Sequence, residues 1–184
     1  MNAEAADPRN AITKAQTRHL TRQIAYILRH SFGIGKNGPN KDVVVCVSGG
    51  QVLLPVVYYA VIAAGGVFSS APTSAIPREL ATQIRAGEGR LLITCPDSLP
   101  NAVEAAKLAR LPPGQVLLLE SMNHKRVFRN ILSGVNYLEH MNPTDLLDWQ
   151  RINDPQTLRD SLICLLYSSG TTGPPKGKLS LIKL

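Results

Sequence analysis

The sequence lacks the residue patterns of a metal site, a disulfide framework and a secretory leader. Its three cysteines, Cys46, Cys95 and Cys164, lie inside or beside apolar runs, without CxxC spacing and without a nearby histidine. Residues 1–10 include charged side chains and no apolar core, which argues against a signal peptide. We therefore expect buried, reduced cysteines, no metal site and a cytoplasmic protein.

No uninterrupted apolar run is long enough to cross a membrane, which takes about 20 residues. Residues 43–77 carry no charged side chain, but Ser48–Gln51, Pro55 and Gly65–Gly66 divide this stretch. A buried strand, a turn and a helix explain the pattern, so no membrane span is expected. The final Ile182-Lys183-Leu184 differs by one residue from the peroxisomal signal Ser-Lys-Leu, which leaves peroxisomal import as an alternative location.

The positive charge is not concentrated in one block. The formal net charge is +7, and the basic residues are scattered along a chain of globular composition. Residues 14–30 predict an amphipathic helix with Lys14, Arg18 and Arg22 on its polar side. A solvated helix face explains this stripe, and we expect no nucleic-acid partner because aromatic residues are not interleaved with the basic ones.

Apolar runs that alternate with helical stretches predict an α/β fold in one domain. Because the strands are apolar throughout, the sheet should be mostly parallel, with helices on both faces. The predicted strands are 43–47, a short one near Val67, 91–94, 115–119 and 162–167. The predicted helices are 14–30, 52–64, 77–85, 98–110 and a short one at 145–149, with an irregular basic stretch at 124–129.

The segment Gly33–Gly38 matches the dinucleotide fingerprint GxGxxG, but its context is reversed. A helix precedes these glycines and a strand follows them, whereas the fingerprint requires a strand before and a helix after. The segment therefore predicts a helix C-cap followed by a loop.

The segment Tyr167–Gly177 reads YSSGTTGPPKG and concentrates groups that bind polyphosphate. Its glycines Gly170 and Gly173 permit positive φ, so that successive N–H groups can converge on an anion. Hydroxyls come from Ser168, Ser169, Thr171 and Thr172, and Lys176 adds a mobile positive charge. The spacing is not that of a Walker A loop. An ordinary surface turn needs neither the lysine nor so many hydroxyls, so we predict a phosphate-binding loop.

This segment resembles the signature loop of the AMP-dependent synthetase and ligase family, and weaker similarity reaches back to about Asp7. Fungal proteins similar to acyl-CoA synthetases and 4-coumarate:CoA ligases look nearest. Members activate a carboxylic acid with ATP and Mg²⁺ to an acyl-adenylate, from which CoA displaces AMP. The resemblance implies that the β- and γ-phosphates of ATP are held by Ser168, Ser169, Gly170, Thr171, Thr172, Gly173 and Lys176.

After Gly177 the chain departs from the family pattern. It has no aromatic-Gly-x-Thr-Glu segment, whose Glu would help hold the metal, no Thr-Gly-Asp segment, whose Asp would hold the ribose, and no lid lysine. We therefore expect residues 1–184 to be a partial N-terminal adenylation domain without a catalytic residue, inactive alone and with weak or no ATP binding. The alternative is a non-catalytic remnant or an interaction module that binds phosphate weakly.

Overall fold

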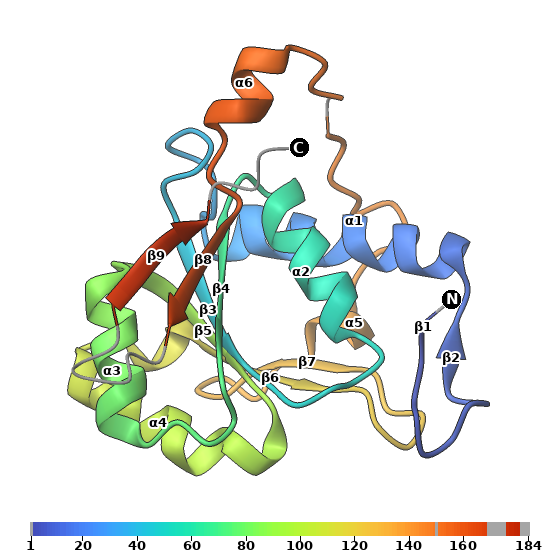
Figure 1. Ribbon diagram of the computed structural model, residues 1–184. Coiled ribbons are helices and arrows are strands. Elements are labelled where there is room, and N and C mark those ends of the chain that lie inside the picture. Colours follow the sequence, from blue (N-terminus) through green and yellow to red (C-terminus); the bar gives the residue numbers. More distant parts are fainter. Residues whose placement is uncertain (1, 150, 169–175, 181–184) are drawn as a thin grey trace.

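The computed structural model describes residues 2–149, 151–168 and 176–180, and a seven-stranded sheet lies at its centre (Figure 1). The strand order is β7-β6-β5-β3-β4-β8-β9, in which the five inner strands are parallel and the outer two are antiparallel to their neighbours. The strands are β3 (Val43–Val47), β4 (Val67–Ala71), β5 (Gly89–Thr94), β6 (Val116–Glu120), β7 (Val127–Asn130), β8 (Cys164–Ser168) and β9 (Lys176–Ser180). The predicted mostly parallel sheet is confirmed.

Helices cover both faces of the sheet (Figure 1), as the alternation of apolar runs predicted. One face packs against α1 (Lys14–Ser31) and α2 (Leu54–Ala63), and the other against α3 (Pro77–Ala86) and α4 (Leu99–Ala109). Strand β3 contributes to both cores, with Val44 and Cys46 on the α1/α2 side and Val45 on the α3/α4 side. Burial on both sides explains why β3 is apolar throughout.

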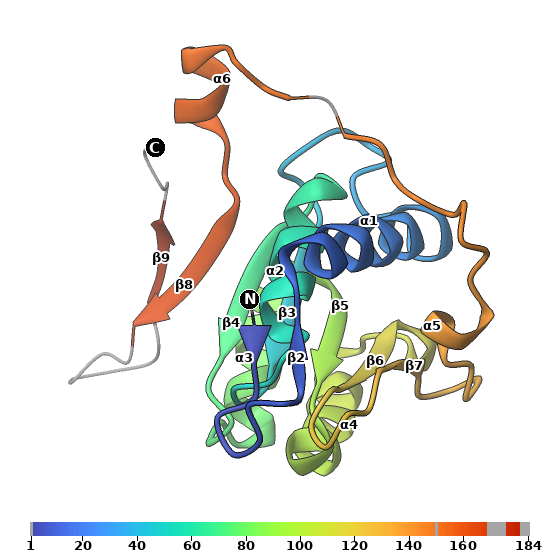
Figure 2. The same cartoon turned by 90° about the vertical axis from the view of Figure 1, so that its right-hand side faces the viewer.

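The shorter elements lie around this framework. They are the strands β1 (Asn2–Ala3) and β2 (Ala11–Ile12), the helices α5 (Tyr137–His140) and α6 (Pro155–Asp160), and the 3₁₀ turns η1 (Pro96–Ser98) and η2 (Pro113–Gln115). The two edges of the sheet are well separated in Figure 2, with β8 and β9 at one edge and β6 and β7 at the other. Among the described residues, no helix combines the length and the apolarity that crossing a bilayer requires.

Local sequence signals fix where the main helices begin. At the start of α1, Thr13 Oγ1 accepts the Gln16 N–H at 3.2 Å while Gln16 Oε1 accepts the Thr13 N–H at 2.8 Å, which forms a capping box. Pro77 opens α3, where its missing N–H leaves no intrahelical bond unmade. These caps agree with the predicted helix starts at residues 14 and 77.

The Gly33–Gly38 segment is the predicted loop after a helix. Helix α1 ends at Ser31 with Phe32 as its C-cap, and β3 follows at Val43. Gly35 has a φ of +74°, and a Cβ there would lie 1.9 Å from the Ala64 carbonyl oxygen. The glycine is thus required for close packing of this loop against the end of α2.

Three local predictions were wrong. Residues 145–149 contain no helix, and the short helices in this part of the chain are α5 and α6. The stretch 124–129, predicted to be irregular, includes most of β7, which pairs antiparallel with β6. The predicted loop 168–177 was too long at both ends, because Ser168 is the last residue of β8 and Lys176–Gly177 begin β9.

Candidate functional site

The ends of the predicted phosphate-binding loop are fixed by a β-hairpin. Ser168 and Lys176 are cross-strand partners at the end of the antiparallel pair β8–β9. Directly opposed residues in such a pair have Cα atoms about 5 Å apart. Segment 169–175 joins these two ends. Five of the predicted phosphate-binding residues lie outside the described residues: Ser169, Gly170, Thr171, Thr172 and Gly173.

Strand β8 ends at the carboxyl edge of the parallel sheet. Because β8 runs parallel to β4, Ser168 lies at the carboxyl edge, where parallel α/β sheets bind their ligands. Only Cys164 and Leu165 of β8 are in register with β4, opposite Phe68 and Ser69. The hairpin therefore continues past the part of β8 that β4 supports.

Helix α3 provides a second anchor for β8. The Tyr167 hydroxyl donates to the Gln83 carbonyl oxygen at 3.5 Å, and the Gln83 side-chain amide donates to Ser69 Oγ at 3.0 Å and to the Ser70 carbonyl at 2.9 Å. Burial raises the pKa of the Tyr167 phenol, which stays a neutral donor at physiological pH. Side-chain contacts with α3 thus hold the residue that directly precedes Ser168.

The carboxyl edge also contains the point where the sheet order reverses. The chain passes from β3 to β4 on one side and then crosses to β5 on the other side of β3. Crevices at such switch points are common ligand sites in open α/β sheets. Loop Ser48–Gln51 follows β3, and Cys95 to Ser98 follow β5. Strand β4 lies between β3 and β8 in the sheet, so the axes of β3 and β8 are about 10 Å apart at the usual strand spacing.

Loop Ser48–Gln51 is held by side-chain hydrogen bonds while its glycines stay open. The Ser121 hydroxyl donates to Gln51 Oε1 at 2.9 Å and accepts the Leu53 N–H at 2.9 Å, and Gln51 Nε2 donates to Ser48 Oγ at 2.7 Å. A Cβ added at Gly49 or Gly50 would have no atom within 4 Å. The backbone there is accessible although its ends are fixed.

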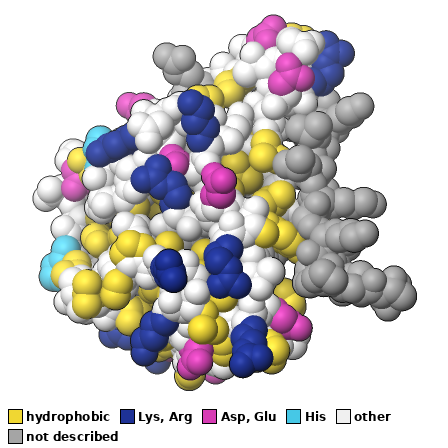
Figure 3. Space-filling view, turned by 90° about the vertical axis from the view of Figure 1, so that its left-hand side faces the viewer, with side chains coloured by type: hydrophobic (Ala, Val, Ile, Leu, Met, Phe, Trp, Pro, Cys, Tyr) yellow, Lys and Arg dark blue, Asp and Glu magenta, His cyan; other side chains and the backbone are white. Residues whose placement is uncertain are grey.

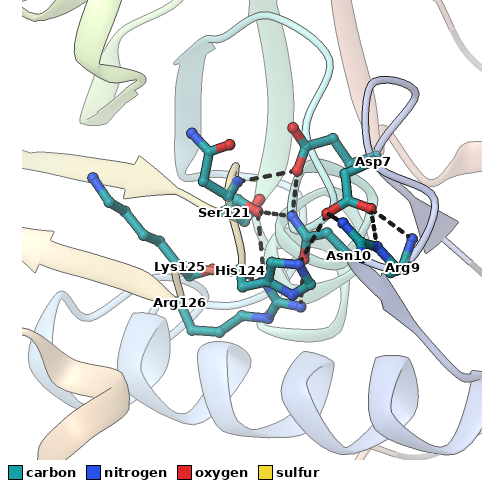
Figure 4. Close-up of polar contacts among 9 residues, drawn as sticks. Asp7, Arg9, Asn10, Ser121, His124, Lys125 and Arg126 are labelled. Atoms are coloured by element: carbon teal, nitrogen blue, oxygen red, sulfur yellow. Dashed lines mark hydrogen bonds and ion pairs between the residues drawn. The ribbon is translucent and has the colours of Figure 1, made fainter.

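A buried polar cluster ties the N-terminal segment to the residues after β6 (Figure 4). Asn10 is fully buried, and its side-chain amide donates to Glu4 Oε2 and, at 2.8 Å, to the Ser121 carbonyl oxygen. Glu4 Oε2 also accepts the Asn123 N–H at 3.0 Å, and Arg126 donates to Asn10 Oδ1 at 3.0 Å. Sequence analysis missed this cluster because 111 residues separate Asn10 from Ser121, and no local pattern signals their contact.

The three cysteines are free and buried, as predicted. Burial raises the pKa of the Cys46 thiol to about 12, with a smaller contribution from the nearby Cys95. At Cys95 burial also acts to raise the pKa, but hydrogen bonds with the Ser98 hydroxyl and with the backbone of Gly49 and Ser98 outweigh it and lower the pKa below the ordinary value. Cys95, in the loop after β5, therefore also contacts the loop after β3.

The described residues do not by themselves form a metal centre. Within 2–149, 151–168 and 176–180, no group of three or more His, Cys, Asp or Glu side chains could hold an ion. The site as described thus consists of a positioned hairpin end and one accessible loop, Ser48–Gln51, whose open backbone suits contacts to an anion.

Sequence comparison finds one family over almost the whole chain. The profile of the AMP-binding enzyme family matches residues 1–179. A putative acyl-coenzyme A synthetase of Emericella nidulans is 48% identical over 177 residues, which are 96% of this chain and 31% of the relative. The 4-coumarate–CoA ligase-like 3 protein of Oryza sativa subsp. japonica is 30% identical over 91% of this chain and 27% of its own length. The chain spans about a third of the length of these curated relatives.

Solved structures share the fold. The benzoate CoA ligase of Burkholderia xenovorans superimposes with a TM-score of 0.68 at 18% identity, over 97% of this chain and 31% of the ligase. Apo MatB of Rhodopseudomonas palustris gives a TM-score of 0.65 at 21% identity, over 96% of this chain and 31% of that protein. At these identities the likeness concerns the fold alone.

Proposed function

Because the chain belongs to the AMP-binding enzyme family, we propose that residues 168–176 form the phosphate-binding part of an ATP site in an acid:CoA ligase. One observation carries the proposal: Ser168 and Lys176 are paired at the carboxyl edge of the parallel sheet. This pairing brings a hydroxyl residue and a lysine to the two ends of one loop. The five intervening site residues named above complete a set of backbone, hydroxyl and ammonium donors.

The proposed reaction begins with attack of a carboxylate on the α-phosphate of ATP, which forms an acyl-adenylate and releases pyrophosphate. As the bond between the α-phosphate and the leaving pyrophosphate breaks, negative charge builds up on the β- and γ-phosphates. Donors that are already in place stabilise this charge in the transition state more than in bound ATP, and so they accelerate the step. Lys176 contributes a full positive charge, and the hydroxyls and N–H groups contribute dipoles.

The proposed loop serves the adenylation half of the reaction only. In the second half the CoA thiol displaces AMP to give a thioester, and the groups that would serve it are expected beyond this chain. Full-length relatives are expected to supply Mg²⁺ with ligands that the described residues do not gather. The substrate is proposed only as a carboxylic acid, because the named relatives differ in the acid that their names imply.

Acid-dependent pyrophosphate release tests the proposal. The isolated chain, supplied with ATP, Mg²⁺ and a panel of aromatic and fatty acids, should release no pyrophosphate, because it lacks the ribose-binding Asp, the metal-binding Glu and the lid lysine of the family. A protein extended to the length of the relatives should be active, and Lys176→Ala should abolish that activity. Acid-dependent turnover by the isolated chain that Lys176→Ala removes would show that residues 1–184 already contain a complete site.

A further inference from the structure

A pocket lies where the parallel strands begin, at the end of the sheet opposite the carboxyl edge that carries Ser168. It is next to the amino ends of β5 and β6, where Gly89 starts one strand and Gln115 precedes the other. Its cavity measures about 420 Å³. Cavities of a few hundred Å³ are the size that holds small organic ligands. The parallel strands run from this pocket toward the proposed phosphate-binding edge, so the two sites are separate.

Three arginines line the pocket, and contacts with other residues hold two of them in place. Arg85 Nη1 donates to the Leu108 carbonyl oxygen at 3.0 Å. Arg90 Nη1 is 2.6 Å from Asp42 Oδ1, and the Asp42 side chain is only 4% exposed. The other Asp42 oxygen accepts the Gly35 N–H at 2.6 Å. The buried carboxylate therefore neutralises Arg90 and fixes its position at the pocket.

Arg110 is the third arginine and is held by its backbone rather than by its side chain. It caps α4 with a φ of +59°, and its N–H donates to the Lys107 carbonyl oxygen at 3.1 Å. Its guanidinium makes no hydrogen bond or ion pair within the described part of the chain. Lys and Arg side chains are scattered over the face that α3 and α4 form (Figure 3), so charge alone does not single out a site there. The pocket differs because its arginines line a hollow of this size rather than a flat surface.

The charge of the lining residues favours a singly charged anion. Glu88 is the one acidic residue among those that line the cavity. Asp42 neutralises Arg90, so Arg85 and Arg110 together with Glu88 leave one net positive charge at the pocket. A carboxylate would compensate this charge, whereas a polyphosphate would exceed it. Guanidinium groups bind carboxylates through paired N–H donors, which adds direction to the attraction.

Apolar side chains form the remaining wall. They are Phe32, Ile84, Leu111 and Pro112. Ile84 is buried in the α3/α4 core, and Phe32 packs edge-on against Tyr137 with ring centroids 5.6 Å apart, so this wall is supported from behind. Such a surface is stabilised when it covers an apolar group, because both surfaces are then removed from water.

We propose that this pocket binds a small carboxylate with an aromatic or branched apolar body. The carboxylate contacts Arg110 and Arg85, and the body packs against Leu111 and Phe32. The proposal goes beyond the ATP site, because the pocket lies at the opposite end of the parallel strands and shares no residue with the loop. Failure of one proposal therefore leaves the other standing.

Titration with 2-naphthoate, followed through the NMR signals of the Gly89, Leu111 and Gln115 amides, tests this inference on the full chain. We expect saturable shifts that the neutral analogue 2-naphthylmethanol produces only at concentrations at least fivefold higher. Inorganic phosphate should bind more weakly than 2-naphthoate, because it has no apolar body. Equal binding of the neutral analogue, or tighter binding of phosphate, would overturn the proposal.

Charge variants identify the residues that bind. Arg110→Gln should raise the Kd of 2-naphthoate at least fivefold, Arg110→Lys should recover part of this loss, and Arg85→Gln should weaken binding independently. Lys107→Gln removes one charge from the same helix, outside the pocket, and should change the Kd less than twofold. Unchanged signals of the β3 amides would show that each variant is folded. An equal loss in Lys107→Gln would mean general surface attraction and would contradict the assignment.

Discussion

Ser168 and Lys176 are opposite each other across the end of the β8–β9 hairpin. In sequence they are the first serine and the only lysine of the predicted phosphate-binding motif, with seven residues between them. Their cross-strand pairing makes the two ends of segment 169–175 neighbours. A phosphate chain bound by the loop would therefore contact groups from both strands.

Nucleotide binding by the isolated chain should be weak and should depend on phosphate rather than on the base. The proposed loop offers donors for phosphate, while the resemblance implies that the family's adenine and ribose contacts belong to segments that this chain does not contain. ATP, GTP and tripolyphosphate should therefore produce similar NMR shifts, with Kd values in the millimolar range. Loss of three contacts of about 1 to 1.5 kcal/mol each weakens a micromolar site by about a thousandfold.

The control for this titration is another lysine of β9. Lys176→Ala should remove the shifts with all three ligands, whereas Lys178→Ala, two residues along the same strand, should leave them nearly unchanged. Tight binding of ATP together with weak binding of GTP would reveal an adenine pocket within residues 1–184. That result would contradict the prediction.

Sequence and structure agree best where both faces of an element are buried. Strand β3 was predicted at its observed bounds, since five consecutive apolar residues have few alternatives. The edge strands β7 and β9 were missed because polar residues such as Arg129 and Lys178 interrupt them, and their pairing depends on distant partners. The motif predicted a loop after β8. No local pattern predicted that the Tyr167 hydroxyl contacts the Gln83 carbonyl oxygen, because these two residues are 84 positions apart in the sequence.

Gly35→Ala should destabilise the protein strongly. The residue has a φ of +74°, and a Cβ would lie 1.9 Å from the Ala64 carbonyl oxygen. Left-handed backbone at a non-glycine residue costs about 1 kcal/mol, and overpacking adds about 1 to 3 kcal/mol. Gly134→Ala is the matched control, since its φ is +73° and no atom lies within 4 Å of the added Cβ. Urea unfolding should show a loss at Gly35 at least twice that at Gly134, and equal losses would rule out the clash.

Ser121→Ala should loosen the loop after β3. The fully buried Ser121 hydroxyl accepts the Leu53 N–H and donates to Gln51 Oε1, both at 2.9 Å. Removing it leaves the buried Leu53 N–H and the half-buried Gln51 side-chain oxygen without this partner, which costs about 1 to 3 kcal/mol. Hydrogen exchange at the Leu53 amide should become faster by at least tenfold. Exposed Ser74→Ala should have no such effect, and unchanged exchange in Ser121→Ala would show that the hydroxyl does not hold the loop.

Stability should fall at high pH, and Cys46 should account for part of the fall. Burial raises the pKa of its thiol from 9.0 to about 12 in the folded state. Below pH 9 the thiol keeps its proton in both states, and its effect on stability is constant. Between pH 9 and about 12 the unfolded chain releases this proton and the folded chain does not, so the free energy of unfolding decreases by roughly 1 kcal/mol per pH unit.

Cys46→Ala should therefore unfold at a lower urea concentration at pH 7 but lose less stability between pH 9 and 11. Cys95→Ala is the control, because hydrogen bonds lower the pKa of that thiol and its ionisation favours the folded state. If Cys46→Ala keeps the full alkaline loss measured for the unmodified chain, the Cys46 thiol is not one of the groups responsible.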